Sequence, residues 1–273
     1  MEQRIRVSMS DGVADVRLSR ADKMNALDQA MFDALVETGG SLARAQGLRA
    51  VVISGEGRAF CAGLDMGRFA LMAGAGGNTA AAELRLETRS HGIANAAQYA
   101  VLVWQDIPVP VIAAVHGVAF GGGFQLALGA DIRFVAPDTR MSVMEIKWGL
   151  VPDMGGMLLM PRLARGDVIR ELTFSGRVFS GTEALALGFA TRVCEDPYAA
   201  ALAFAREVAG MSPHAVRASK RLMQVMQAGD AAAILRAESD EQGRLIGSAN
   251  QREAVMANIE KRAPNFTEAE ADA

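Results

Sequence analysis

Residues 112–131 read IAAVHGVAFGGGFQLALGAD, and this stretch decides the fold. An apolar, β-branched run typical of a buried strand meets three consecutive glycines, and helical spacing follows at Leu126, Leu128 and Ala130. Glycines at a strand-to-helix junction let a ligand approach the backbone closely. The first amides of a helix lack internal partners and favour negative charge. The stretch therefore predicts a junction that serves either tight packing or the binding of an anion or oxyanion.

A second stretch, residues 50–65, reads AVVISGEGRAFCAGLD and combines another buried strand with a turn of small residues. The two stretches, in this order and about sixty residues apart, resemble the crotonase superfamily, which contains the enoyl-CoA hydratases and isomerases. The resemblance runs from about residue 5 to residue 266. The matching motifs are Ala59-Phe60-Cys61-Ala62-Gly63-Leu64-Asp65, Gly121-Gly122-Gly123, Glu145-Ile146, Gly149-Leu150-Val151-Pro152 and Glu260-Lys261-Arg262.

The pattern along the chain predicts an α/β architecture with a helical C-terminal appendage. Strand–strand–helix units fill the first two thirds, and only helix signals remain from about residue 198 to residue 262. The resemblance implies a crotonase-like ββα spiral, with a catalytic core at residues 1–197 and a helical oligomerisation region at 198–273. It also implies homotrimers or dimers of trimers.

Local patterns predict the elements in more detail. Two runs that alternate around Asp11-Gly12 indicate a hairpin, and the Ala- and Gly-rich residues 68–77 indicate a mobile loop. A helical pattern extends over residues 80–106 and stops before Pro108 and Pro110. The expected strands are Ile5–Ser10, Val13–Leu18, Ala50–Ser54, Ile132–Ala136 and Arg140–Ser142, and the expected helices include Leu27–Leu42, Gly156–Leu163, Arg165–Ser175 and Thr182–Leu187.

The composition narrows the function classes. The 273 residues are 51% apolar, which is enough for a sizeable core, and the net charge of −3 provides no footprint for nucleic acid. Two cysteines and three scattered histidines make neither a disulfide framework nor a metal signature. The first residues lack the apolar core of a signal peptide, and no apolar run is long enough to span a bilayer. We therefore expect a cytoplasmic protein without metal, membrane or nucleic-acid partner.

The glycine-rich turns are suited to stabilising a thioester oxygen that becomes negatively charged. Backbone N–H donors need small neighbours rather than a particular side chain. The resemblance implies that the amides of Ala62 and Gly122 form this oxyanion hole. The alternative for the glycines is tight packing at strand ends.

The acid–base residues depart from the hydratase pattern. The family's hydratases carry two glutamates, of which Glu145 matches the second, whereas Gln125 stands in place of the first. A carboxylate among apolar neighbours should have a raised pKa, which helps it to exchange protons near neutral pH. An amide can orient substrate or water but cannot take up a proton. The alternative for Glu145 is a surface carboxylate at a strand edge.

Asp153 is the candidate second carboxylate. Dienoyl-CoA isomerases of the superfamily have an aspartate at this place, and Glu145 with Asp153 resembles their proton-moving pair. Those isomerases also have an aspartate where Gln125 stands, so the match is incomplete. The alternative for Asp153 is a turn residue after Pro152 or a cap of the next helix.

The resemblance implies that coenzyme A is part of the substrate and not a tightly bound cofactor. It also implies that coenzyme A lies along the turn at residues 59–65. Lys23 and Lys261, the latter from a neighbouring subunit, are candidates for its phosphates; the alternative is that both are surface charges. Cys61 is expected to pack rather than to act as a nucleophile with His116, and Asp65 to cap a helix. The implied CoA-binding residues are Lys23, Ala59, Ala62, Gly63, Leu64, Asp65 and Lys261.

Three functions stay open on the sequence alone. The first is an acyl-CoA-thioester enzyme that shifts C=C bonds of an enoyl- or dienoyl-CoA, with Glu145 as the proton shuttle and Asp153 as a second one. The alternative is an enoyl-CoA hydratase that uses a single glutamate, with Gln125 positioning the water. The third is a non-catalytic acyl-CoA-binding or scaffold protein.

Overall fold

The predicted N-terminal hairpin forms the edge of a six-stranded sheet. The computed structural model describes residues 3–68, 86–228 and 230–268. Asp11 and Gly12 make the hairpin turn, and β1 and β2 pair in antiparallel register, whereas all later strands of this sheet pair in parallel. The strand order is β1 (Ile5–Ser10), β2 (Val13–Leu18), β3 (Ala50–Gly55), β4 (Val111–Val115), β6 (Ile132–Val135) and β9 (Arg192–Val193).

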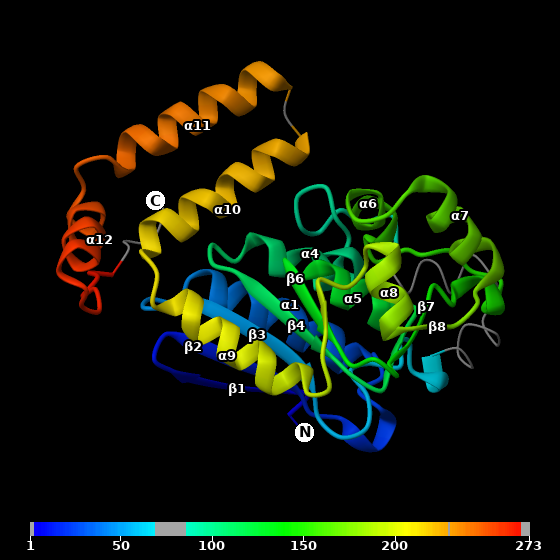
Figure 1. Cartoon of the computed structure of the whole chain (residues 1–273). Helices are drawn as coiled ribbons and strands as arrows, with labels where there is room; N and C mark the ends of the chain where they lie inside the picture. The colour runs from blue at the N-terminus through cyan, green and yellow to red at the C-terminus, as the bar shows by residue number, and fades with distance from the viewer. Residues whose placement is uncertain (1–2, 69–85, 229, 269–273) are drawn as a thin grey trace.

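Both faces of the sheet are covered, so β3 and β4 are buried along their whole length and, apart from Ser54, carry no polar side chain. On one face, α1 (Gln29–Ala43) and α4 (Ala96–Asp106) pack together and contribute Leu35 and Trp104 to the main core. On the other face, Ala201 and Ala205 of α9 (Pro197–Ala209) pack against Val52, Ile112 and Phe134 (Figure 1). Because α9 packs on the sheet, it lies with the core, and the predicted boundary at residue 198 cuts through its first turn.

The decisive stretch contains one more strand than the sequence predicts. After β4 the chain changes direction at Gly117, where a φ of +64° favours glycine. The next strand, β5 (Val118–Phe120), belongs to a second sheet. This sheet also contains β7 (Arg140–Ser142) and β8 (Phe179–Ser180), in the order β5–β7–β8. The glycine cluster therefore leads from β5 into α5 (Gly122–Gly129), and the helix packs against α4.

The helix predicted over residues 80–106 is shorter than expected. Residues 86–95 form turns and a bridge, and α4 begins only after Asn95. Asn95 accepts a hydrogen bond from the Gln98 amide, and the Gln98 side chain accepts one from the Asn95 amide, which completes a capping box. This cap, which outweighs the helical spacing before it, fixes the start of the helix. The predicted loop over residues 68–77 lies, from residue 69 on, outside the described residues.

The remaining helices follow the sequence pattern closely, and α10–α12 extend away from the sheets (Figure 1). No helix among the described residues is long and apolar enough to cross a membrane. The short 3-10 helices are η1 (Ala21–Lys23), η2 (Glu145–Trp148) and η3 (Met160–Arg162). The α-helices are α6 (Gly156–Leu159), α7 (Gly166–Ser175), α8 (Gly181–Leu187), α10 (Pro213–Ala228), α11 (Ala231–Leu245) and α12 (Ala249–Glu260).

An ion pair between a buried lysine and a partly exposed aspartate holds α10 to the core. The Lys220 ammonium donates to Asp131 Oδ2 at 2.7 Å and to the Val109 carbonyl oxygen at 2.9 Å. Only 8% of the Lys220 side chain is exposed, compared with 32% of the Asp131 side chain. The same Asp131 oxygen accepts a hydrogen bond from the Val111 amide at the start of β4. The two partners therefore depend unequally on each other, because an unpaired Asp131 can be solvated and an unpaired Lys220 cannot.

We expect Asp131→Ala to lower the free energy of unfolding by about 3 kcal/mol, because it leaves a buried ammonium without its counter-charge. Lys220→Met should cost only about 1 kcal/mol, because the stem still packs and Asp131 keeps its bond to the Val111 amide. Urea unfolding of both variants at one protein concentration measures the difference. An equal or larger loss for Lys220→Met would contradict this account.

Candidate active site

The parallel pairing of β5 with β7 brings the glycine cluster next to Glu145. Phe120 pairs with Ser142, and the Gly121 amide donates to the Ser142 carbonyl oxygen at 3.0 Å. Glu145 follows three residues later as the first residue of η2. A Cβ atom added at Gly121 would lie only 3.3 Å from Glu145 Oε1. The absence of a side chain at Gly121 therefore makes room for the carboxyl group beside the start of α5.

Glu145 is buried, with 9% of its surface exposed, so it is not a surface carboxylate at a strand edge. Its Oε1 accepts a hydrogen bond of 2.6 Å from Gln125 Nε2. Its Oε2 is buried without a hydrogen-bond partner among the described residues. Burial raises the pKa of this carboxyl group, the hydrogen bond from Gln125 lowers it, and the nearby charge of Asp153 raises it again. The net pKa is raised, which confirms the direction predicted from the sequence.

The side-chain amide of Gln125 forms hydrogen bonds with other residues of the protein. Its side chain lies on α5 and is 1% exposed. While Nε2 donates to Glu145, the Oε1 atom accepts from the backbone amides of Met154 at 3.0 Å and Gly156 at 2.9 Å. Both lone pairs of Oε1 are thus occupied. Gln125 therefore has no acceptor left for a substrate or a water molecule, and its predicted role in orienting either one stays a prediction that only the second N–H of Nε2 could fill.

Asp153 lies on the turn that Gln125 holds, just before α6. Its carboxyl group makes no hydrogen bond to another described residue, and the residue before α6, Gly155, provides no side-chain cap. Asp153 therefore does not cap this helix. The residue is exposed, but the protein around its carboxyl group removes part of the water there, and this desolvation raises the pKa of Asp153 above the ordinary value of 3.8. It is close enough to Glu145 to raise the pKa of that group as well.

The turn at residues 59–65 faces the glycine cluster. A Cβ atom at Gly63 would lie 3.6 Å from the Gly122 amide nitrogen and 2.5 Å from the Phe120 carbonyl oxygen. Asn25, which the sequence analysis did not single out, holds this turn by donating to the Ala59 carbonyl oxygen at 2.9 Å. The backbone carbonyl oxygen of Asn25 also accepts a hydrogen bond from the Cys61 thiol, with 3.1 Å to Sγ. The sequence offers no signal for this role beyond an asparagine at the end of a polar turn.

The prediction of Ala62 as an oxyanion donor is wrong. Its amide already donates to the Met24 carbonyl oxygen at 2.9 Å. Within the described part of the chain, the amide of Leu64 and the first amide of α5, that of Gly122, have no hydrogen-bond partner. Since Gly63 brings these two segments together, Leu64 and Gly122 are the pair of donors that the geometry leaves free. The predicted donor at Gly122 keeps this role as a prediction.

Other predicted residues have structural roles. Cys61 is fully buried and burial raises the pKa of its thiol to about 12, so it packs as expected and does not act as a nucleophile. Asp65 accepts from the Gly67 amide at 2.8 Å and pairs with Arg20 at 2.6 Å. Burial alone would raise the pKa of Asp65, but these contacts lower it below its usual range. The hydrogen bond from the Gly67 amide confirms the prediction that Asp65 caps the helical turn that follows it.

The predicted coenzyme A contacts are only partly brought together. Ala59, Gly63 and Leu64 lie in the turn opposite Gly122, and Lys23 is exposed at the end of η1. Lys261 directly follows α12, and α12 lies far from α5 (Figure 1). Its predicted role requires a neighbouring subunit and stays a prediction. Among the described residues, no group of His, Cys, Asp and Glu could hold a metal ion.

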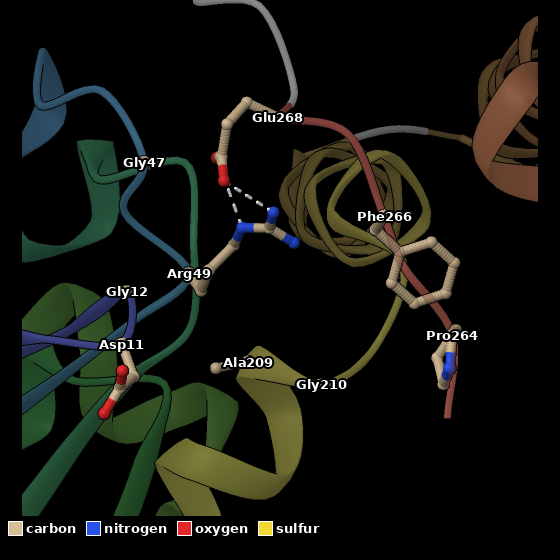
Figure 2. A pocket seen from close by; sticks show the side chains of 9 residues that line it. All are labelled: Asp11, Gly12, Gly47, Arg49, Ala209, Gly210, Pro264, Phe266 and Glu268. Carbon is tan, nitrogen blue, oxygen red and sulfur yellow. Dashed lines mark hydrogen bonds and ion pairs between the residues drawn. The ribbon is translucent and has the colours of Figure 1, made fainter. Parts of the chain in front are cut away.

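A cavity of about 340 Å³ lies elsewhere, between the β1–β2 turn, the end of α9 and the C-terminal segment (Figure 2). Arg49 and Glu268 form an ion pair of 2.7 Å across it. No residue predicted for the site lines this cavity, and its charged pair neutralises itself. The lining residues are Asp11, Gly12, Gly47, Arg49, Ala209, Gly210, Pro264, Phe266 and Glu268.

The chain is similar to a known protein family and to several known enzymes. A family model described as enoyl-CoA hydratase/isomerase matches residues 8–269. The mitochondrial Delta(3,5)-Delta(2,4)-dienoyl-CoA isomerase of Mus musculus is 35% identical over 214 residues, which are 76% of this chain and 64% of the isomerase. The mitochondrial methylglutaconyl-CoA hydratase of the same species is 31% identical over 262 residues, 93% of this chain and 79% of the hydratase.

A solved structure of an enoyl-CoA hydratase from Bacillus anthracis is similar to nearly the whole chain. The TM-score is 0.86 with 27% identity, over 97% of this chain and 99% of the other. This match confirms the mixed α/β fold with C-terminal helices that the sequence predicts. The chain spans slightly less than two thirds of the dienoyl-CoA isomerases it matches.

Proposed function

This chain belongs to the enoyl-CoA hydratase/isomerase family, and we propose that it shifts a carbon–carbon double bond of an enoyl- or dienoyl-CoA. The observation that carries the proposal is that one side chain, Gln125, bonds both the buried Glu145 carboxyl group and the turn that carries a second carboxyl group, Asp153. Coenzyme A enters as part of the substrate, and the proposed reaction needs no tightly bound cofactor. We further propose that the enzyme acts in the cytoplasm.

Substrate binding would begin at the two free amides. The thioester oxygen accepts hydrogen bonds from Leu64 and Gly122, at the start of a helix whose dipole favours negative charge. When a proton leaves the carbon beside the carbonyl group, charge develops on this oxygen and the two bonds strengthen. Each such donor contributes roughly 2.7–4 kcal/mol to transition-state stabilisation.

Proton transfer would then use the two carboxyl groups. Ionised Glu145 takes a proton from the carbon beside the thioester, and the conjugated electrons shift along the acyl chain. In the state in which Asp153 holds a proton, it gives that proton to the carbon at the far end, so one proton leaves and one arrives. The raised pKa of each group brings its proton exchange closer to neutral pH.

Hydration is the second candidate, because the methylglutaconyl-CoA hydratase match covers 93% of the chain. A single glutamate would then have to activate water and protonate the product. Gln125 cannot share this work, since its oxygen is bonded to Met154 and Gly156. This occupancy of Gln125 is why we rank isomerisation first.

The test is incubation with 2-enoyl-, 3-enoyl- and 3,5-dienoyl-CoA in H₂¹⁸O, followed by mass and ultraviolet spectra. We expect a bond shift without ¹⁸O uptake, which Asp153→Asn lowers by about 10²-fold or more. Asp138→Asn, an exposed aspartate in a turn, is the matched control and should retain wild-type turnover. Rapid uptake of ¹⁸O would instead establish hydration, and binding without turnover would reject both reactions.

A further inference from the structure

Gln125 joins two parts of the proposed active site that are not neighbours in sequence. Through Nε2 it is bonded to the Glu145 carboxyl group at 2.6 Å, and through Oε1 to the amides of Met154 and Gly156. The side chain is 1% exposed and is enclosed by Gly156, where a Cβ atom would lie 2.7 Å from its Oε1. Any rotation of the carboxamide would therefore break all three hydrogen bonds.

These bonds leave the two oxygens of Glu145 in unequal positions. Oε1 is fixed by Gln125 and faces the backbone of Gly121. Oε2 is buried, and among the described residues it has no hydrogen-bond partner. A buried acceptor that is left unpaired costs free energy, and an unpaired carboxylate oxygen beside the start of α5 would gain a partner from a bound substrate. Because Gln125 already holds Oε1, Oε2 is the oxygen of Glu145 that is left to meet the substrate.

We propose that Gln125 is a positioning residue, which fixes Glu145 so that Oε2 transfers the proton and which couples this carboxyl group to the turn carrying Asp153. The inference rests on the proposed function, in which Glu145 and Asp153 act at the two ends of the shifting bond system. Asp153 directly precedes Met154, so one side chain holds Glu145 through Nε2 and, through Oε1, the turn that carries Asp153.

An amide suits this task better than a carboxylate would. Glutamine donates to Glu145 and accepts from two amides at once. A carboxylate at residue 125 would accept equally well, but it needs a proton before it can donate. Two carboxyl groups at 2.6 Å share one proton, so Glu145 would lose part of its capacity as a base. The hydrogen bond from Gln125 instead favours the ionised form of Glu145 and lowers its pKa against the effect of burial.

The decisive variant is Gln125→Met, which has a similar length and no hydrogen bonds. With glutamate labelled with ¹³C at the side-chain carboxyl carbon, NMR titration follows Glu145, whose signal is identified by its loss in Glu145→Gln. We expect the pKa of Glu145 to rise, because a bond that stabilises the carboxylate is lost. We also expect kcat to fall roughly 10- to 100-fold with little change in KM, and its acidic limb to move to higher pH.

Gly156→Ala is a second, independent variant, because its Cβ displaces the Gln125 carboxamide without removing it. It should change the pKa of Glu145 and kcat in the same directions. The control is Gln224→Met, since Gln224 on α10 also bonds a backbone oxygen, that of Gln105, but lies outside the site. We expect this control to match the wild type.

An unchanged titration of Glu145 in a folded Gln125→Met or Gly156→Ala protein would overturn the inference, as would a kcat within about threefold of the wild type. The titration needs no substrate, so it separates the two proposals. Wild-type protein that turns over no acyl-CoA would reject the proposed function, whereas the NMR result would still decide whether Gln125 fixes Glu145.

Discussion

Replacing Glu145 with glutamine is expected to reduce kcat by about 10²- to 10⁴-fold, the usual contribution of a group that transfers protons in the transition state. Glutamine has the same shape, and its oxygen can still accept the bond that Gln125 Nε2 donates. What it loses is the basic oxygen at the position of Oε2. The measurement is the rate of the double-bond shift, by ultraviolet absorption, in wild-type and variant protein at equal concentration.

Stability should respond differently from activity. The pKa of Glu145 is raised in the folded protein, so folding favours its protonated form. This favourable contribution is fully present below the ordinary value of 4.5 and is lost as the pH rises through the higher folded value. At neutral pH the ionised group therefore opposes folding, and the melting temperature of Glu145→Gln should be no lower than that of the wild type.

Glu207→Gln is the matched control, because Glu207 is exposed on α9. It should retain full turnover, which separates loss of the Glu145 base from loss of negative charge. If Glu145→Gln kept more than about a tenth of the wild-type kcat, the carboxyl group would not be the proton shuttle. A large drop in melting temperature would contradict the raised pKa, because it would mean that the ionised carboxyl group stabilises the folded protein.

Much of the fold can be predicted from local patterns, because each depends on near neighbours in the sequence. The alternation around Asp11-Gly12 gives the hairpin, and the predicted helix Arg165–Ser175 differs from α7 by one residue. The errors arise where a contact between distant parts of the sequence determines the local structure. The apolar run 111–120 looks like one strand, but its second part pairs with β7 in another sheet, and no local pattern encodes this partner.

In the candidate site, too, local motifs are informative and contacts between distant segments are not visible in the sequence. Sequence motifs identify Glu145, Asp153 and the two turns, because their residue types match the chemistry. They do not show whether a backbone amide is free, and Ala62 is occupied only because Met24, from a distant segment, accepts its hydrogen. They also do not show that Gln125 bonds Glu145, since this contact depends on the parallel register of β5 and β7. Long-range geometry therefore assigns roles that spacing leaves open.

Gly63→Ala is expected to lower kcat by about 10²- to 10³-fold, which is the loss that follows removal of one oxyanion donor. Its Cβ atom would lie 2.5 Å from the Phe120 carbonyl oxygen, so the turn and the end of β5 must move apart. Those two segments carry the free amides of Leu64 and Gly122. The measurement is kcat together with the dissociation constant of free coenzyme A, which should change less than kcat.

The φ of Gly63 is +87°, which alanine also disfavours, so the effect of backbone strain must be separated from that of the contact. Gly47→Ala provides this control, because Gly47 has a φ of +71° and nothing within 4 Å of an added Cβ atom. It should lose only the stability that backbone strain costs, less than Gly63→Ala loses, and no turnover. If folded Gly63→Ala kept wild-type kcat, the amides of Leu64 and Gly122 would not hold the thioester oxygen. A drop in kcat confined to Gly63→Ala would support them, because only there does the added atom change the distance between the two donors.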